Sequence, residues 1–289
     1  MINTDIQITT DSVCDLPPQI YSKYNIHVIY SRIVTDYGDF YDSKEITSTN
    51  LIEYYATQQN RVTTLCPSVQ EYNDFFARES ETSCRILHIA VSSDISDSYL
   101  NAKKAAQTNE KVYIFDSKQL SGGIGILVLI AASLAKDGKT IDEIIKKLEY
   151  YRECIYSASV IRSMKYFQPD HFRKNFTLRK YITRILNNRF IHPSFFIKGG
   201  SLEMKKLYLG SIEKYSKKFV RNELRKHDKT DNSIIIIAYA DCPYEILDAI
   251  RIEISRYIHF EHILSTPMAA VTTSHCGPNT IALFYITVN

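Results

Sequence analysis

The chain has 289 residues, of which 45% are hydrophobic and 23% are charged, and its formal net charge is +3. This composition is typical of a soluble globular protein of one or two domains, and it excludes disordered and fibrous chains. The six cysteines, at positions 14, 66, 84, 154, 242 and 276, form no Cys-x-x-Cys pair, so we expect neither a structural metal site nor a disulfide framework.

The sequence gives no signal for a membrane or for secretion. The amino-terminal stretch MINTDIQITTDS lacks the basic and apolar regions of a signal peptide. The longest uncharged run, 119–135, is too short and too rich in small residues to span a bilayer. We therefore expect a cytoplasmic protein that is not an integral membrane protein.

Charge is distributed unevenly along the chain. Residues 161–230 contain 18 Lys and Arg against 5 Asp and Glu, a balance of +13, so the remainder carries −10. Such a segment is either a solvated helical surface or a docking surface for an acidic partner or for phosphates. It contains no recognisable nucleic-acid motif and no aromatic stacking platform, so nucleic acid is not an expected partner.

The first half of the chain alternates short apolar strands with helical patterns. Strands are expected over 6–10, 27–34, 85–91 and 112–115, and helices over 19–24, 50–58, 69–81, 97–107, a run ending at 135, and 141–154. Ser48, Ser68 and Thr140 are candidate helix caps. Alternation of this kind predicts βαβ units and a parallel sheet.

The second half is more basic and less regular. Helices are expected over 173–186, 211–226 and 244–258, a hairpin over 193–210 with its turn at Gly199-Gly200, and strands over 234–239 and 281–288. We place a domain boundary near Tyr150. The predicted fold is thus two α/β domains, a parallel-sheet N-terminal domain (1–150) and a mixed-sheet C-terminal domain (151–289).

Hydroxyl groups follow the predicted strands at the edge where α/β sheets bind ligands. They occur at 10–12, 63–68, 92–98, 116–117 and 121, with few charges suited to acid–base work. Near the carboxyl end, His275 is expected on a loop before the Gly277-Pro278 turn, flanked by the hydroxyls of residues 272–274. His275 is therefore a candidate metal ligand, partner of a nucleophile, or donor to a bound molecule.

Motifs for several enzyme classes are missing or incomplete. There is no Gly-x-Ser-x-Gly elbow and no nucleotide-binding loop, and SGGIG at 121–125 lacks the dinucleotide spacing. Its glycines are expected to permit close helix packing or the approach of a ligand. His259 and His262 have no evident third ligand. Cys276 is adjacent to His275, but a nucleophile and its base meet through folding, so adjacency alone does not make a dyad.

Five segments stand out in chain order: ITTDSVCDLP (8–17), TLCPS (64–68), VSSDISDSYLNA (91–102), VYIFDSKQLSGGIG (112–125) and HCGPN (275–279). Together they resemble the DegV family of bacterial fatty-acid-binding proteins. The family includes the fatty-acid-carrying B subunits of fatty acid kinase. The resemblance implies two α/β domains that enclose one long-chain fatty acid between them.

The resemblance also implies a ligand site. It places the ligand carboxylate at Thr64, Ser96 and His275. Residues expected to line or support the site are Asp11, Ser12, Ser98, Ser121, Gly122, Gly123 and Gly277. The chain departs from the family pattern at Leu65 and Asp97, and it lacks a Gly-Gly-Arg stretch near the start of the second domain.

Two hypotheses of different classes follow. In the first, the protein is not an enzyme; it binds a long-chain fatty acid, needs no cofactor or metal, and presents the carboxylate to a fatty acid kinase. The candidate docking residues are Arg173, Lys174, Arg179, Lys205 and Lys206. In the second, it is a hydrolase or transferase acting on a small acyl or phosphorylated substrate through Ser96, Ser12 or Cys276, with His275 as the base.

Overall fold

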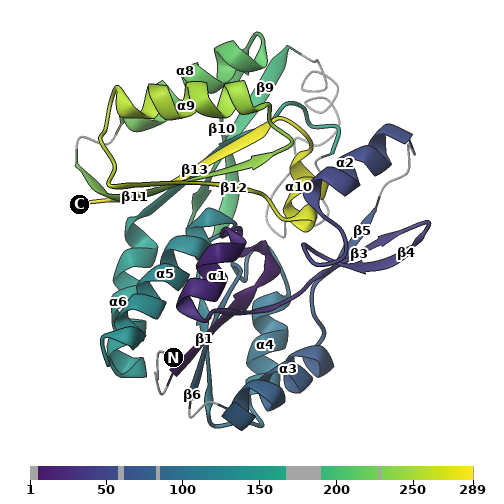
Figure 1. Cartoon of the computed structure of the whole chain (residues 1–289), viewed down its shortest axis with the longest axis vertical. Helices are drawn as coiled ribbons and strands as arrows, with labels where there is room; N and C mark the ends of the chain where they lie inside the picture. Colours follow the sequence, from purple (N-terminus) through teal and green to yellow (C-terminus); the bar gives the residue numbers. More distant parts are fainter. Residues whose placement is uncertain (1–5, 58–61, 83–84, 167–189, 227–228, 289) are drawn as a thin grey trace.

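The computed structural model describes residues 6–57, 62–82, 85–166, 190–226 and 229–288 (Figure 1). The strands are β1 (Ile6–Asp11), β2 (His27–Ile29), β3 (Arg32–Thr35), β4 (Gly38–Tyr41), β5 (Thr63–Leu65), β6 (Arg85–Ala90), β7 (Val112–Asp116), β8 (Ile155–Val160), β9 (Ile191–Lys198), β10 (Ser201–Leu209), β11 (Thr230–Ala240), β12 (His262–Pro267) and β13 (Thr280–Thr287). The helices are a 3-10 turn (Ser12–Cys14), α1 (Pro18–Tyr24), α2 (Ser48–Thr57), α3 (Val69–Thr82), α4 (Ser98–Ala106), α5 (Gly122–Lys136), α6 (Ile141–Cys154), α8 (Ile212–Leu224), α9 (Tyr244–Ser255) and α10 (Ala270–Cys276).

The first half of the chain builds a parallel sheet of order β2-β1-β6-β7. Helices α3 and α4 cover one face of this sheet, where Phe76, Ile86 and Ala102 share a core cluster. Helix α5 covers the other face, with α1 and α6 beside it (Figure 1). The parallel sheet predicted from alternating strands and helices is confirmed.

The second half builds a six-stranded mixed sheet of order β10-β9-β8-β13-β11-β12. Strands β11 and β12 are parallel, whereas the other neighbours pair antiparallel. Helices α8 and α9 cover its outer face, and the side chains of Phe219 and Ile250 join its core cluster. The expected mixed sheet in this half of the chain is therefore present, with β13 at its centre.

Helix α5 is the layer that the two sheets share. It packs against β1 and β6 on one side and against β13, β11 and β8 on the other. One core cluster consequently spans both sheets and includes Leu87, Leu127 and Phe284. A helix packed between two sheets must be apolar over most of its circumference, which explains the run Ile124–Ala135, where Ser133 alone is exposed. The chain thus folds as stacked layers in the order α3/α4, sheet, α5, sheet, α8/α9 (Figure 1).

The strand predicted over 27–34 is wrong, because the chain breaks it into β2 and β3. Strand β2 joins the parallel sheet, whereas β3 leaves it to form a small antiparallel sheet of order β4-β3-β5. The break lies at Ser31, whose N–H donates to Ser12 Oγ (3.2 Å) and whose carbonyl accepts from the Asp42 N–H (2.9 Å). These partners are distant in sequence, so no local pattern predicts them.

Helix caps and turns are mostly where the sequence indicates. Thr140 and Glu143 form a reciprocal capping box, and Ser68 with Glu71 forms a second one. The hairpin of β9 and β10 turns at Gly199-Gly200 as predicted. The cap of α2 is Thr47 instead of Ser48, because Thr47 Oγ1 accepts a hydrogen bond from the Asn50 N–H at 3.2 Å. The helix predicted over 173–186 lies outside the described residues.

Strands β4, β5, β8 and β12 were not predicted. Strand β8 follows α6 without an intervening turn, because α6 ends at Cys154 and β8 begins at Ile155. The chain crosses from the first sheet to the second at this junction. Within the described ranges, no helix has the length and hydropathy needed to cross a bilayer.

Gly122 should be intolerant of a side chain, because α5 approaches the second sheet most closely there. A Cβ atom at this position would lie 2.5 Å from Phe284 Cδ2 and 2.8 Å from Ile236 Cγ2. We expect Gly122→Ala to lower the free energy of unfolding by about 1–3 kcal/mol through overpacking, as measured by urea denaturation. Ser133→Ala, at an exposed position of the same helix, is the control and should change it by less than about 0.5 kcal/mol. Equal effects of the two substitutions would contradict the close packing.

Candidate functional site

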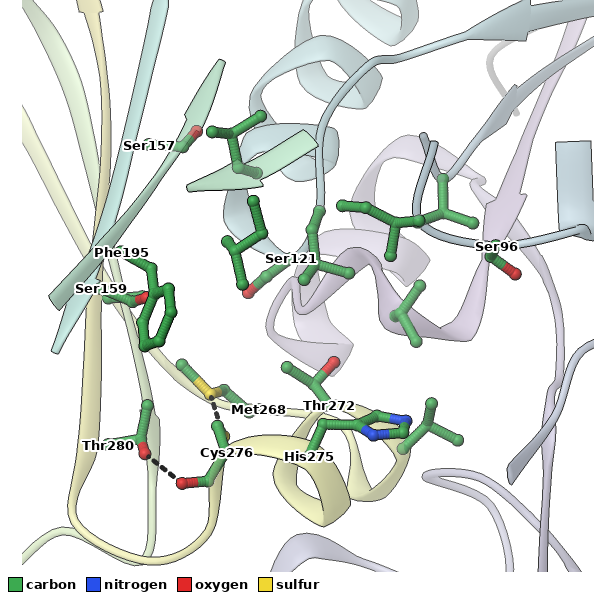
Figure 2. Close-up of a pocket in the computed structure, with 18 of the residues that line it drawn as sticks. Ser96, Ser121, Ser157, Ser159, Phe195, Met268, Thr272, His275, Cys276 and Thr280 are labelled. Atoms are coloured by element: carbon green, nitrogen blue, oxygen red, sulfur yellow. Dashed lines mark hydrogen bonds between the residues drawn. The ribbon is translucent and has the colours of Figure 1, made fainter. Parts of the chain in front are cut away.

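A cavity of about 450 Å³ lies where the two sheets meet. On one side it is lined by segments that follow β1, β6 and β7, which end at the carboxyl edge of the parallel sheet. On the other side it is lined by β8, β9, β13 and α10 (Figure 2). Its volume falls in the range of about 300–1,000 Å³ that is usual for small-molecule sites. The ligand-binding edge expected of an α/β sheet is therefore hollow here.

The structure brings Thr64, Ser96 and His275 to this one cavity. Thr64, on β5, lies with its Oγ1 3.2 Å from His275 Nε2, although 211 residues separate them in sequence. Ser96 lies between β6 and α4, and its Oγ accepts a hydrogen bond from the Ser98 N–H at 3.2 Å. The cavity thus has one polar end made of hydroxyls and an imidazole, with Leu65 beside it as a partly exposed side chain.

His275 lies in the last turn of α10 and not on a loop as the sequence indicated. Helix α10 is short, and backbone N–H groups at its amino end donate to two aspartate side chains from the first half of the chain. The Ala269 N–H donates to Asp15 Oδ1 (2.7 Å), and the Val271 N–H donates to Asp42 Oδ1 (3.2 Å). Caps of this kind stabilise helix termini. They fix the helix that carries His275 against β3 and α2.

The same two carboxylates bind serine hydroxyls and have raised pKa values. Ser121 Oγ donates to Asp15 Oδ2 (2.5 Å), and Ser12 Oγ donates to Asp42 Oδ2 (2.6 Å). Burial raises the pKa of Asp15 to about 8, although the hydrogen bonds from Ser121 and Ala269 oppose the rise. Burial also raises the pKa of Asp42. Ser121 lines the cavity, whereas Ser12 lies behind its wall, bonded to Asp42.

Asp11 supports the site from behind and does not line the cavity. Its Oδ1 accepts from Tyr72 Oη (2.5 Å) and Ser98 Oγ (3.1 Å), and its Oδ2 accepts from the Val91 N–H (2.8 Å). Burial disfavours its charged form, but the interactions with His88 and with these donors outweigh burial and lower the pKa of Asp11. Asp11 therefore ties α3, α4 and β6 together beneath Ser98, which does line the cavity.

The three glycines proposed to support the site serve packing. Gly122 and Gly123 sit under Phe284 and Gln119 at the start of α5, where a Cβ would collide with either neighbour. Gly277 has φ +73° and lies against the ring of Tyr166, which leaves no space for a side chain.

The hairpin of β9 and β10 closes the cavity from the second sheet. Phe195 and Leu202 line the cavity from its two strands. The hairpin tip is anchored on the first half of the chain, because Ser92 Oγ donates to the Gly200 carbonyl at 2.7 Å. Lys118 pairs with Asp94 at 2.9 Å beside this anchor.

Two of the three residues proposed as a nucleophile, Cys276 and Ser12, are poorly placed for that chemistry, whereas Ser96 lines the cavity together with His275. Burial raises the pKa of the Cys276 thiol to about 12, so the thiol stays protonated near neutral pH. Its sulfur lies 3.8 Å from Met268 Sδ (Figure 2). The Ser12 hydroxyl is bonded to Asp42. His259 and His262 are exposed, and the described residues contain no group of three or more potential metal ligands.

The candidate docking residues divide into two kinds. Lys205 pairs with the buried carboxylate of Glu223 at 3.1 Å and contacts Tyr156, so it belongs to a structural network. Lys206 is exposed on β10. Arg173, Lys174 and Arg179 lie outside the described residues.

Sequence reasoning missed the wall of the cavity that the second sheet provides. No motif marked the missed lining residues, which are Ser157, Ser159, Phe195, Phe196, Leu202 and Met268. The one available signal was the alternation Ser157-x-Ser159 in an otherwise apolar stretch, since residues two apart on a strand share a face.

Known proteins of similar sequence share the whole length of this chain. The model of the DegV family, whose members are described as uncharacterised proteins, matches residues 5–288. A DegV domain-containing protein of Clostridium perfringens is 25% identical over 293 residues, which cover 97% of this chain and 98% of the relative. One from Staphylococcus aureus is 27% identical over 280 residues, which cover 96% of each chain.

Solved structures share the fold. A DegV family protein from Thermus thermophilus, described for its fatty acid binding, matches with a TM-score of 0.87 at 21% identity, covering 98% of this chain and 99% of that one. DegV from Bacillus subtilis, described as a fatty acid binding protein, has a TM-score of 0.81 at 18% identity, with 99% and 100% covered. A DegV family protein from Eubacterium eligens, loaded with heptadecanoic acid, has a TM-score of 0.81 at 16% identity, with 98% and 100% covered.

Stability should depend on pH through Asp15. Its pKa is about 8 in the folded protein, above its ordinary value of 3.8, so its stabilising contribution is complete below pH 3.8 and is lost progressively as the pH rises to 8. Asp15→Asn preserves an acceptor for the Ala269 N–H and does not titrate. We expect the free energy of unfolding of the variant, relative to wild type, to increase from pH 5 to pH 9 in guanidinium denaturation. A difference that stays constant across this range would contradict the raised pKa.

Proposed function

The chain belongs to the DegV family, and from this membership and the geometry of its cavity we propose that it binds a long-chain fatty acid between its two sheets. The carboxylate lies at Thr64, Ser96 and His275, and the hydrocarbon chain extends along the side chains of the second sheet. The observation that carries this proposal is the cavity itself, which joins one cluster of hydrogen-bonding groups to an apolar wall. This wall includes Phe284, and also Phe195 and Met268 (Figure 2).

Burial of the hydrocarbon chain supplies the driving force. A sixteen-carbon acid has about fourteen methylenes, each worth roughly 0.8 kcal/mol when buried, so the gross gain is on the order of 11 kcal/mol. Association and ordering consume part of that gain. The carboxylate opposes burial unless it is paired, and two hydroxyls with an imidazole satisfy it through charge-assisted bonds. The contact between Thr64 and His275 places two of these groups together.

The related structures support this ligand class. Proteins of the same fold from Thermus thermophilus and Eubacterium eligens are described as binding fatty acids, in the second case heptadecanoic acid.

Position 97 carries an aspartate next to the proposed carboxylate site, and this residue is exposed at the start of α4. A solvated Asp97 weakens binding less than a buried carboxylate would, because water screens the repulsion.

We propose further that the protein acts as a carrier that presents the bound carboxylate to a separate fatty acid kinase in the cytoplasm. The sequence has no nucleotide-binding loop of its own, and the Cys276 thiol is held in its protonated form. The basic segment 161–230 carries 18 Lys and Arg against 5 Asp and Glu, an excess of positive charge that would favour an acidic or phosphate-bearing partner.

Fatty-acid binding is tested by the lipid that the purified protein retains. Protein prepared without added ligand should release about one equivalent of a long-chain fatty acid on denaturation and extraction, measured by mass spectrometry, because an empty apolar cavity of this size is unfavourable.

The carboxylate site is tested by single substitutions. We expect a loss of fatty-acid binding free energy of about 1–3 kcal/mol for each of Thr64→Ala, Ser96→Ala and His275→Ala. The effects should not add, since the three residues share one carboxylate.

The matched control is His259→Ala, which removes an exposed histidine that does not line the cavity. It should leave affinity and lipid content unchanged. A folded wild-type protein that yields no lipid and does not bind added fatty acid would overturn the proposal. Wild-type affinity in His275→Ala would place the carboxylate elsewhere in the cavity.

The kinase partnership is tested by reversing charge in the basic segment. Substituting Glu at Arg173, Arg179 and Lys206 together should abolish phosphorylation of the bound fatty acid by a fatty acid kinase, while lipid content stays unchanged. Lys205 is left intact because it pairs with Glu223. Lys104→Glu, on the exposed surface of α4, is the control and should be phosphorylated like wild type. Normal phosphorylation of the triple variant at low salt would assign the segment a solubilising role instead.

A further inference from the structure

The wall of the cavity away from the carboxylate site carries more hydroxyl groups than a saturated hydrocarbon tail requires. Figure 2 shows Ser157, Ser159 and Thr280 on the side of the cavity opposite Ser96, with Ser121 between them. Strand β8 contributes Ser157 and Ser159, which are two residues apart and so face the same way.

Most of these hydroxyls use their proton within the protein. Ser121 Oγ donates to Asp15 Oδ2 (2.5 Å), and Ser157 Oγ donates to the Gln119 side-chain oxygen (2.6 Å). Thr280 Oγ1 donates to the Gly277 carbonyl at 2.9 Å. Their presence is explained by the fold, because each hydrogen bond ties one element of the cavity wall to another.

Ser159 differs from its neighbours. It sits in β8 between β13 and β9, opposite Ala282 and Phe195, yet it is partly exposed because its side chain faces the cavity. Within the part of the chain that the structure describes, its hydroxyl forms no hydrogen bond. Buried polar groups are normally hydrogen-bonded. Because Ser159 lines the cavity, a molecule bound there can supply the missing partner of its hydroxyl.

We propose that Ser159 is a specificity residue and that the ligand is a long-chain fatty acid carrying a hydroxyl group on its chain, away from the carboxylate. This inference rests on the proposed fatty-acid function and narrows its ligand class. The Ser159 hydroxyl donates to the ligand hydroxyl or accepts from it. The oxygens of Ser121 and Ser157 have lone pairs left to accept the remaining proton.

The energetics favour such a ligand over a saturated one. A saturated tail excludes water from the cavity and leaves the Ser159 hydroxyl without a partner, whereas a hydroxylated chain pairs with it. Leaving one buried hydroxyl unpaired lowers affinity by about tenfold. The competing explanation is size, since serine is small and makes room for any tail. Alanine removes the hydroxyl and keeps the small size, so Ser159→Ala separates the two explanations.

The experiment compares the affinity of delipidated wild type, Ser159→Ala and Ser159→Thr for octadecanoic acid and for its 10-, 12- and 18-hydroxy derivatives. The 2-hydroxy derivative serves as the control, because its hydroxyl lies beside the carboxylate and should gain nothing at Ser159. We expect wild type to bind at least one of the three hydroxy acids about tenfold more tightly than octadecanoic acid. Ser159→Ala should lose this preference, and Ser159→Thr should retain it.

The outcomes distinguish the inference from the function on which it rests. If wild type binds octadecanoic acid as tightly as every hydroxy acid, the inference is overturned and fatty-acid binding stands. If Ser159→Ala keeps the preference for a hydroxy acid, the assignment to Ser159 is overturned. If wild type binds none of these acids, the proposed function itself fails.

Discussion

The cavity depends on a helix whose first backbone N–H groups donate to aspartate side chains from the opposite half of the chain. Asp15 and Asp42 accept the N–H groups of Ala269 and Val271 at the start of α10, and the far end of that helix carries His275 to Thr64. A seven-residue helix has little stability of its own. Its position, and with it the geometry of the polar end of the cavity, is therefore set by contacts that cross between the two sheets.

The layered architecture explains why the site is hollow at one place and closed elsewhere. Helix α5 fills the space between the sheets along Ile124–Ala135, and the cavity begins at Ser121, just before the amino end of the helix. The small side chains of β8 face that opening, and the hairpin of β9 and β10 closes it through Phe195. The side chains alone leave this part of the core unfilled, and the proposed fatty acid would occupy the space.

Local patterns predicted the parts of the fold that local interactions determine. Three such features could be recognised in the sequence: the capping box at Thr140, the hairpin turn at Gly199-Gly200 and the apolar run of α5. The break at Ser31 and the helical setting of His275 were not, because both are fixed by carboxylates and hydroxyls more than ten residues away. The grouping of Thr64, Ser96 and His275 came from family resemblance, since residue spacing alone gives no distance across 211 positions.

Strand β13 lies between β8 and β11 at the centre of its sheet, although it is the last strand in chain order. Neither neighbour can complete its backbone hydrogen bonding until residues 280–287 have been synthesised. On the ribosome, the face of α5 that packs against β13 stays exposed until late in translation, and this face is apolar. The edges of β8 and β11 that pair with β13 also stay unpaired until then. Such a chain is expected to need protection by chaperones during synthesis, and a block in translation before Thr280 should yield an aggregation-prone product.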